Sequence, residues 1–420
     1  MARDARHDDA HDRDLDPAVP AAVAVHLAVR EPVPGAAGQI AAGVAEGRAR
    51  AEGPHGCHGV GVMQVYASAM GQVDNVGDTV LRRGFLDALR RVGPLHVYVG
   101  ARDDDHLSGL GLHDGDRLYR TSAEWRGRLS KALTAERSLY AFDTGETEVQ
   151  RAFAMRYLRL APLLVAARLR GGAAAHVGVG VREPTAWRVP ISAVLRLCQV
   201  VTWRDEPSRR MMGVGGVSPD WAFALGAPED VLLAAPDDAD RRTLAIAVRA
   251  SLSHAERDRP DARWIAAIGT LADELGLEPV VVAQIERDGP LAEELADALG
   301  AEAVVWDGPN HAKQEARLRA VYRGSRAVVS DRLHALVIAA TEGAVPIGLA
   351  NGDDDKVVRT LAAAGITGTS VDRALADPDT ALATARDAIG RHAEIMASVV
   401  EARRTIDAVV DGLVELTAGR

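Results

Sequence analysis

The sequence predicts an α/β protein built from two doubly wound domains, each with a parallel sheet, that face each other across a cleft. Its 420 residues are enough for two or three domains of ordinary size. From Gly59 onward, short apolar runs alternate with amphipathic stretches, which is typical of βα units. The same strand, turn and helix pattern occurs in both halves, without a shorter repeat. Ligands of such folds usually lie at the carboxyl ends of the strands, so the cleft is the expected site.

The first half is predicted to open with a strand over Val60–Ser68, a turn at "NVGD" and a helix over Thr79–Gly93. Apolar residues recur at helical spacing in that helix, and Gly93 followed by Pro94 ends it. A second strand follows at "HVYVG". Further along, "AAAHVGVGV" over Ala173–Val181 predicts a buried strand, and "VPISAVLRLCQVV" predicts a helix.

The second half repeats this alternation. Strands are predicted at "RRTLAIAVR", "EPVVVAQI", "AEAVVWDG" and "RAVVS", and helices at "ARWIAAIGTLADEL", "GPLAEELADALG" and "HAKQEARLRAVYRGS". We therefore divide the chain into a disordered tail over residues 1–55, an N-terminal domain over 56–203 and a C-terminal domain over 204–385. Residues 386–420 are expected to form a helix that crosses back over the first domain.

Charge and composition exclude several classes of protein. Lys and Arg number 49 against 59 Asp and Glu, and the net charge of -10 argues against a broad nucleic-acid or anionic-membrane surface. Any basic chemistry must therefore be local. Cys57 and Cys198 are the only cysteines, so neither a disulfide framework nor a four-cysteine zinc site is available. The longest N-terminal apolar run, Ala21–Val29, is too short to span a bilayer, and we expect a cytoplasmic protein.

No metal or cofactor is predicted. His55, Cys57 and His58 lie close together, but their spacing matches no zinc pattern and no fourth ligand is nearby. Asp103–Asp105 and Asp353–Asp355 are runs of carboxylates without further spaced oxygen ligands, and we interpret them as solvated loop charge. The chain contains no Walker phosphate loop, and its glycine-rich segments lack the strand-to-helix context of a dinucleotide fingerprint.

The segment "VVSDRLHALVIAATEGAVPIGL" begins as an apolar strand and places Arg332 and His334 at the start of an apolar helix. Ser330 or Asp331 is the expected N-cap. Because Cα–Cβ bonds tilt toward a helix N-terminus, both side chains are expected to lean over the strand's end into the cleft. Free backbone N–H groups and a guanidinium favour a small anion there, and an imidazole can transfer a proton near neutral pH. The residues alone favour a plainer interpretation, in which Arg332 pairs with Asp331 or a neighbouring acid and His334 only completes the start of the helix.

Two other segments hold candidate ligand-binding residues. Arg204 in "WRDEPS" follows an apolar run, where it can bind an anion or pair with Asp205 or Glu206. The "DNVGD" segment contains Gly77, where the backbone turns tightly or approaches a ligand, and Asp78, the expected cap of the next helix. The residues alone leave a structural and a functional interpretation open for both segments.

Taken together, four features resemble the polysaccharide pyruvyl transferase family. They are "QVDNVGDTVL" (72–81), "VTWRDEPSRRMMGVGGVSPDWAF" (201–223), the "S-x-R-L-H" of 330–334 with the small residues and "G-x-P" that follow, and Lys356 at the start of a helix. Each is a weak match alone, but their order and spacing cover most of the chain between about residues 60 and 385. The resemblance implies a two-domain fold of the GT-B type.

The family transfers the enolpyruvyl carbons of phosphoenolpyruvate onto a sugar as a ketal, so the resemblance implies a transferase with phosphoenolpyruvate as donor. His334 would then be the general acid, and Arg332 and Arg204 would bind the donor anion. The resemblance also places other residues near the substrates: Leu333 through its backbone, Asn75 and Asp78 at the acceptor sugar, and Lys356 at an anion.

The implied acceptor is a saccharide, sugar nucleotide or lipid-linked sugar in cell-surface polysaccharide or secondary-metabolite assembly. No nucleic-acid partner is expected, and peripheral association with a membrane-bound glycan assembly is compatible with this role. Many family members have a glycine triplet in the first domain where this chain reads "SLYAFDTGETEVQ" (138–150), so the acceptor is not predicted. Two alternatives remain: a GT-B glycosyltransferase that uses a nucleotide sugar, and a non-catalytic binding protein on the same fold.

Overall fold

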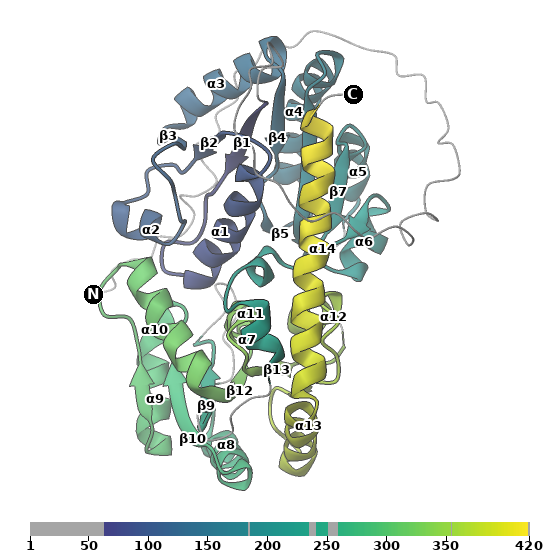
Figure 1. Cartoon of the computed structure of the whole chain (residues 1–420). Helices are drawn as coiled ribbons and strands as arrows, with labels where there is room; N and C mark the ends of the chain where they lie inside the picture. The colour runs from purple at the N-terminus through teal and green to yellow at the C-terminus, as the bar shows by residue number, and fades with distance from the viewer. Residues whose placement is uncertain (1–62, 184, 235–240, 251–258, 354, 419–420) are drawn as a thin grey trace, which may run out of the picture. The chain divides into compact units, whose positions relative to one another are not determined.

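The computed structural model describes residues 63–183, 185–234, 241–250, 259–353 and 355–418 (Figure 1). The predicted tail over residues 1–55 lies outside these ranges, as do Cys57 and His58. Two parallel sheets, one from each half of the chain, form the centre of the described part. They confirm the predicted α/β class with two Rossmann-like halves.

The first sheet has eight strands in the order β3-β2-β1-β4-β6-β7-β8, with β5 paired to β6, and all its described pairs are parallel. Its strands are β1 (Gln64–Ser68), β2 (Leu95–Tyr98), β3 (Arg117–Tyr119), β4 (Ser138–Ala141), β5 (Gly145–Thr147), β6 (Ala173–Val181), β7 (Val200–Trp203) and β8 (Gly216–Val217). Its helices are α1 (Val76–Arg90), α2 (Asp104–Ser108), α3 (Ser122–Ala135), α4 (Arg151–Leu169), α5 (Arg188–Leu195) and α6 (Glu206–Met212). Because β8 pairs with β7, this sheet continues beyond the domain boundary predicted at residue 203.

The second sheet has six parallel strands in the order β11-β10-β9-β12-β13-β14. Its strands are β9 (Thr243–Ala247), β10 (Glu278–Val282), β11 (Glu302–Val304), β12 (Ser325–Ser330), β13 (Val345–Ala350) and β14 (Ser370–Asp372). The helical elements of this half are η1 (Trp221–Ala224), α7 (Glu229–Leu233), α8 (Ala262–Leu275), η2 (Glu286–Asp288), α9 (Gly289–Leu299), α10 (His311–Gly324), α11 (Leu333–Thr341), α12 (Lys356–Ala363), α13 (Pro378–Gly390) and α14 (His392–Ala418).

The first helix begins earlier than predicted. Asn75 has an extended backbone and its side chain accepts a hydrogen bond from the N–H of Gly77, so it is the N-cap of α1. The "NVGD" segment is therefore the cap and first turn of a helix, and the prediction that Asp78 caps it was wrong. At the other end of the chain, the predicted single helix from residue 386 is divided between α13 and α14.

The apolar core follows the alternation of side chains along the strands. Val65 and Ala67 of β1 belong to a cluster that extends through α1, η1 and the second sheet, whereas Tyr66 between them belongs to an aromatic cluster on the other face of the first sheet. The larger cluster includes Trp221 of η1 and Leu333 at the start of α11. The segment that leads into the second half is thus anchored by the same core as α1.

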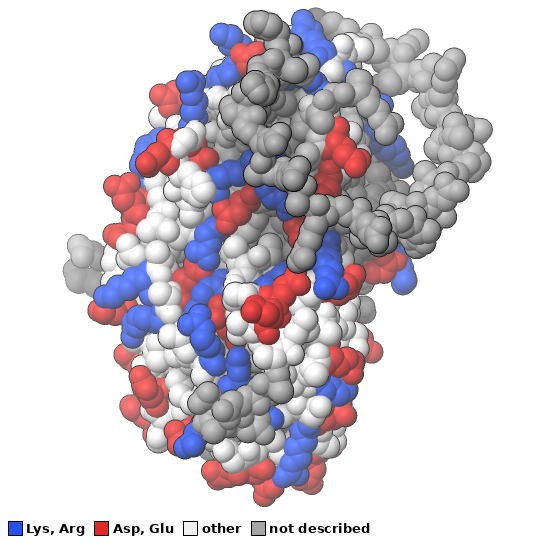
Figure 2. Space-filling view, viewed as in Figure 1, with Lys and Arg blue, Asp and Glu red and all other residues white. Residues whose placement is uncertain are grey.

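Charged residues of both signs are interspersed over the molecular face in Figure 2. Ion pairs also link elements distant in sequence, as between Arg91 after α1 and Asp411 of α14 (2.8 Å). No helix formed by the described residues is both long and apolar enough to cross a membrane.

The C-terminal helix α14 packs against η1, α7 and α1 of the described chain (Figure 1). Its Arg403 donates three hydrogen bonds to backbone carbonyls in and just after η1: to Phe223 (2.9 Å), Leu225 (2.6 Å) and Ala227 (2.6 Å). One guanidinium therefore satisfies three acceptors of a segment that has no sheet partner for them.

We expect Arg403→Met to lower the free energy of unfolding by about 2 to 3 kcal/mol, because it removes charge-assisted hydrogen bonds and leaves their carbonyls unpaired. Urea denaturation of the variant measures this directly. Arg404→Met is the matched control, since Arg404 is exposed and forms only surface ion pairs. Equal stability of the two variants would show that the hydrogen bonds of Arg403 to these carbonyls do not stabilise the fold.

Candidate active site

The turn between β12 and α11 is held by Ser330. Its hydroxyl donates to the carbonyl of Ala247 (2.5 Å) and accepts from the N–H of Arg332 (2.8 Å). Arg332 itself occupies the N-cap position of α11, without a side-chain capping bond, so the prediction of Ser330 or Asp331 as the cap was wrong. Asp331 instead accepts from the N–H of Arg249 (2.9 Å). The side chains before the helix fix the turn and leave the first N–H groups of α11 uncapped by them.

Arg332 is buried and forms an ion pair with Asp288 of η2. Its Nη2 lies 2.6 Å from Oδ1 and 2.5 Å from Oδ2 of that carboxylate, which also accepts from the N–H of Ala250 (3.0 Å). Burial lowers the pKa of Arg332, and Asp288 opposes this effect. The acid that balances Arg332 is therefore not its neighbour Asp331 but a residue 44 positions away.

His334 lies in the first turn of α11, with Nε2 3.4 Å from Oδ2 of Asp220. The same oxygen is 3.5 Å from Nη1 of Arg204, and Oδ1 of Asp220 accepts from the N–H of Ala222. Burial alone would raise the pKa of Asp220, but His334 and Arg204 together hold it at about 2. A fully buried carboxylate thus links the imidazole to Arg204.

A second ionic cluster surrounds Glu146 of β5. Lys356 places its Nζ 3.3 Å from this carboxylate, Arg182 lies at 2.9 Å and Arg204 at 3.8 Å. Burial would raise the pKa of Glu146, but the three cations hold it at about 2. Arg204 also faces Asp220 and Arg182 also pairs with Glu148, so the cluster joins three cations to three carboxylates.

The start of α1 meets the start of α11. The side-chain oxygen of Asn75 accepts from Gly77 (2.9 Å) and from the side-chain amide of Gln284 (2.9 Å), which belongs to the loop after β10. A Cβ on Gly77 would lie 2.6 Å from Cβ and 2.8 Å from Nδ1 of His334, so only glycine permits this approach. Two helix N-termini, each with positive dipole ends, therefore converge around His334.

The structure brings most of the predicted site residues together. Arg204, His334 and Lys356 are connected through Asp220 and Glu146, and Asn75 contacts the loop beside His334. Two other predicted residues lie next to this group. Asp78 accepts from the N–H of Gln72 (2.9 Å) and lies 3.6 Å from Arg82, and Leu333 is buried in the core as the first residue of α11.

The sequence predicted that Arg332 and His334 point into an open cleft, and this prediction was wrong. Arg332 is 8% exposed and His334 is 7% exposed. Beside them, the segment before α1 is joined to the loop after β10. A β-bridge links Asn75 to Ile285, and the N–H of Glu286 donates to the carbonyl of Asp74 (2.9 Å). The site is thus a closed junction between the two sheet-bearing halves.

Sequence reasoning missed the acids of the site. Asp220 lies within the "SPDWAF" segment that carried part of the family resemblance, so its position could have been noted there. Glu146 falls in the region where the resemblance fails, and Asp288 is placed by tertiary structure alone. Nothing in the local sequence pairs either one with its cation.

Within the described ranges, no group of three or more His, Cys, Asp or Glu side chains is arranged to hold a metal ion. The aspartate runs have structural contacts instead. Asp103 caps α2, Asp355 caps α12, and Asp104 pairs with Arg120. The cluster of His55, Cys57 and His58 lies outside the described residues.

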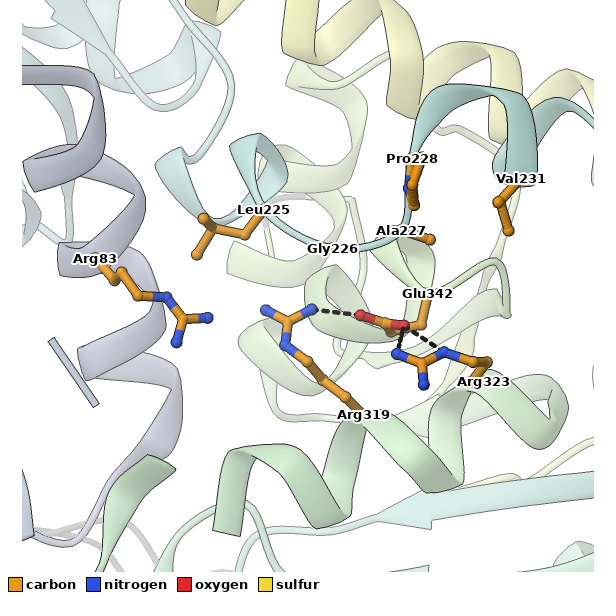
Figure 3. Close-up of a pocket in the computed structure, with 9 residues that line it drawn as sticks. All are labelled: Arg83, Leu225, Gly226, Ala227, Pro228, Val231, Arg319, Arg323 and Glu342. Carbon is orange, nitrogen blue, oxygen red and sulfur yellow. Dashed lines mark hydrogen bonds and ion pairs between the residues drawn. The ribbon is translucent and has the colours of Figure 1, made fainter. Parts of the chain in front are cut away.

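A pocket of about 540 Å³ lies at the opposite end of α11 (Figure 3). Arg319 and Arg323 point into it and both bind Glu342, the C-cap of α11, at 2.7 and 2.8 Å. Arg83 also lines the pocket and pairs with Glu315. These three arginines already have carboxylate partners in Glu342 and Glu315.

The pKa of Glu146 predicts a pH-dependent stability. A carboxyl whose pKa is about 2 in the folded chain and near its ordinary value when unfolded stabilises the fold fully above pH about 4.5, and loses this as the pH falls toward 2. Such a shift corresponds to roughly 3 kcal/mol. We therefore expect Glu146→Gln to lose much less stability than the wild type between pH about 5 and about 2.

Denaturant unfolding across this pH range measures the effect. Glu148→Gln is the control, because the Glu148 side chain is 42% exposed and its ion pair with Arg182 is at 3.3 Å. If Glu146→Gln and Glu148→Gln follow the same pH profile as the wild type, the buried cation cluster does not stabilise Glu146 as described.

Comparison with known proteins gives two independent likenesses. The sequence model of the family described as polysaccharide pyruvyl transferase matches residues 75–354, two thirds of the chain. The fold is similar to the UDP-GlcNAc 2-epimerase from Neisseria meningitidis bound to UDP-GlcNAc, with a TM-score of 0.51 and 12% identity over 84% of this chain and 99% of the other.

A putative UDP-N-acetylglucosamine 2-epimerase from Listeria monocytogenes is similar as well, with a TM-score of 0.50 and 13% identity over 84% of this chain and 97% of the other. At such low identity these structures establish a shared two-domain fold and nothing about the reaction. No curated protein matches the chain in sequence.

Proposed function

Because the chain belongs to the polysaccharide pyruvyl transferase family, we propose that it transfers the pyruvyl carbons of phosphoenolpyruvate to two hydroxyls of a sugar as a ketal. The observation that supports this most directly is the junction where His334 is linked through Asp220 to Arg204, with the buried Arg332 two residues before His334. Phosphoenolpyruvate has a phosphate and a carboxylate on three carbons. A small site with several cations and a proton donor suits it.

The cations of the junction can exchange their present partners for a donor anion. Arg204, Lys356 and Arg182 lie around Glu146, so a phosphate or carboxylate of the donor would replace this glutamate as their partner. Arg332 has a full partner in Asp288, and its guanidinium retains further N–H groups for an anion. The uncapped N–H groups at the start of α11 add donors aimed at the same place.

The proposed reaction begins with a proton transfer to the methylene carbon of phosphoenolpyruvate. His334 would donate this proton, which gives C2 oxocarbenium character, and a sugar hydroxyl would add to C2 and release its own proton. Phosphate then leaves with the electron pair of its C–O bond, and a second hydroxyl closes the ketal. One phosphoenolpyruvate and one diol give one ketal and one phosphate.

Two groups would assist these steps. Asp220, 3.4 Å from Nε2, would orient the imidazole and stabilise its protonated form. Arg204 and Arg332 would stabilise the charge that grows on the departing phosphate, as fixed cations do in a site shielded from water. Both assignments depend on the buried position of these residues, because water would weaken each interaction.

Substrates reach such a site only when the junction opens. The contacts that close it beside His334 include the Asn75 to Ile285 bridge, the Asn75 to Gln284 hydrogen bond, and the ion pair of Arg287 with Asp74 (3.3 Å). We propose that Asn75 and Asp78 then contact the acceptor sugar. The acceptor would be a sugar, sugar nucleotide or lipid-linked sugar for a cell-surface polysaccharide, used in the cytoplasm without a cofactor.

We expect phosphoenolpyruvate to raise the melting temperature of the wild type, and phosphate to be released when a suitable sugar acceptor is added. His334→Asn should reduce phosphate release at least about 100-fold, because the general acid is lost, while donor binding through the arginines remains. The measurements are the thermal shift, the release of phosphate and the mass of the ketal product.

His113→Asn is the control, since His113 is exposed. Stabilisation by nucleotide sugars but not by phosphoenolpyruvate would favour a GT-B glycosyltransferase instead. Full phosphate release by His334→Asn would remove the proposed general acid. A lack of donor affinity and of turnover across many acceptors would favour a non-catalytic binding protein.

A further inference from the structure

Helix α4 has an apolar stripe on its outer side that no described residue covers. The helix packs on α3, α5 and β6 through its buried face, which includes Tyr157 and Leu164. Ten large apolar side chains are exposed in the described chain, and four of them lie on this one helix. They are Met155 (36%), Leu158 (39%), Val165 (39%) and Leu169 (82%).

These four residues lie on one face. Together with the exposed Pro162 they follow a spacing of three, four, three and four residues, which places them in a line along an α-helix. Scattered exposed apolar residues need no explanation, but an aligned stripe on a soluble surface usually marks a contact. The helix is therefore apolar on two sides, one facing the core and one facing outward.

The charges on α4 are all positive. The helix contains four arginines, Arg151, Arg156, Arg159 and Arg168, and no acid, in a chain whose net charge is -10. By helical geometry Arg159 and Arg168 flank the stripe on opposite sides, and Arg151 lies one turn before Met155. Within the described chain, Arg151, Arg159 and Arg168 form no ion pair. Their charge is available to an outside partner.

The start of α5 adds to this surface. Thr185, just before α5, donates a hydrogen bond to the carbonyl of Val149, just before α4, so the two helix starts are neighbours. Exposed residues at the start of α5 are again apolar or basic: Trp187 is 37% exposed and Val189 is 66% exposed, with Arg188 between them. Tryptophan favours the boundary between water and lipid.

We propose that α4 docks the protein on an anionic membrane surface, with its apolar stripe in the headgroup layer and its arginines on the lipid phosphates. An apolar stripe flanked by basic residues, on a helix too charged to span, is typical of helices that lie in the interface. Each arginine near an anionic surface strengthens binding roughly fivefold. The inference depends on the surface of α4 and not on the proposed reaction.

A second copy of the chain is a poorer partner for this face. Symmetric pairing along α4 would bring the arginines of both copies together, and α4 has no acid to balance them. An anionic lipid surface satisfies both the arginines and the apolar stripe. Since α4 begins five residues after Glu146, docking would also hold the candidate site near the membrane.

Vesicle co-sedimentation tests the proposal. The full chain should pellet with vesicles of phosphatidylglycerol and phosphatidylcholine, and not with phosphatidylcholine alone. The triple variant Leu158→Gln, Val165→Gln and Leu169→Gln should weaken this binding at least about tenfold. The triple variant Arg151→Gln, Arg159→Gln and Arg168→Gln should weaken it about a hundredfold and remove its salt dependence.

A matched control is Val231→Gln with Leu233→Gln on α7, where both side chains are 53% exposed. This control should bind vesicles like the wild type, and all variants should melt like the wild type because every changed residue is exposed. Absence of binding to anionic vesicles would overturn the proposal, as would equal binding by the α4 variants. A dimer in light scattering that the apolar variant converts to monomer, without vesicle binding, would assign the face to a second copy.

Discussion

The contact between Gly77 and His334 is the constraint on which the candidate site depends. Only a hydrogen at position 77 allows the first turn of α1 to contact the first turn of α11. Two turns later on the same face of α1, Gly84 makes a second close contact, with the carbonyl of Trp221. Trp221 directly follows Asp220. The small face of one helix from the first half therefore sets the positions of both the imidazole and its carboxylate partner in the second half.

Burial of so many charges is stable only because each one has a partner. Isolated ions in such a place would cost several kcal/mol each, and the structure avoids this by sharing: Asp220 lies between His334 and Arg204, and Glu146 lies among three cations. Under the proposed function, the phosphate and carboxylate of the donor would replace some of these carboxylates as partners of the cations.

Much of the fold could be predicted from the sequence, and the reasons are local. The strand Ala173–Val181 is a continuous apolar run and the helix Ala262–Leu275 has a regular apolar face, so both were predicted with the bounds that the structure has. The start of α1 was predicted late because Asn75 and Asp78 are equally good capping residues. The partner of Arg332 and the burial of the junction depend on contacts between distant segments, which spacing along the chain does not encode.

The affinity of a Gly77→Ala variant for phosphoenolpyruvate, measured by calorimetry, tests most directly whether the two helix starts form the donor site. The added methyl group would overlap His334 and the amide of Gln284, so the account predicts binding at least about tenfold weaker than in the wild type. Gly127→Ala, in a position of α3 with open space around it, should bind like the wild type. Unchanged affinity in Gly77→Ala, or no donor binding by the wild type, would contradict the account.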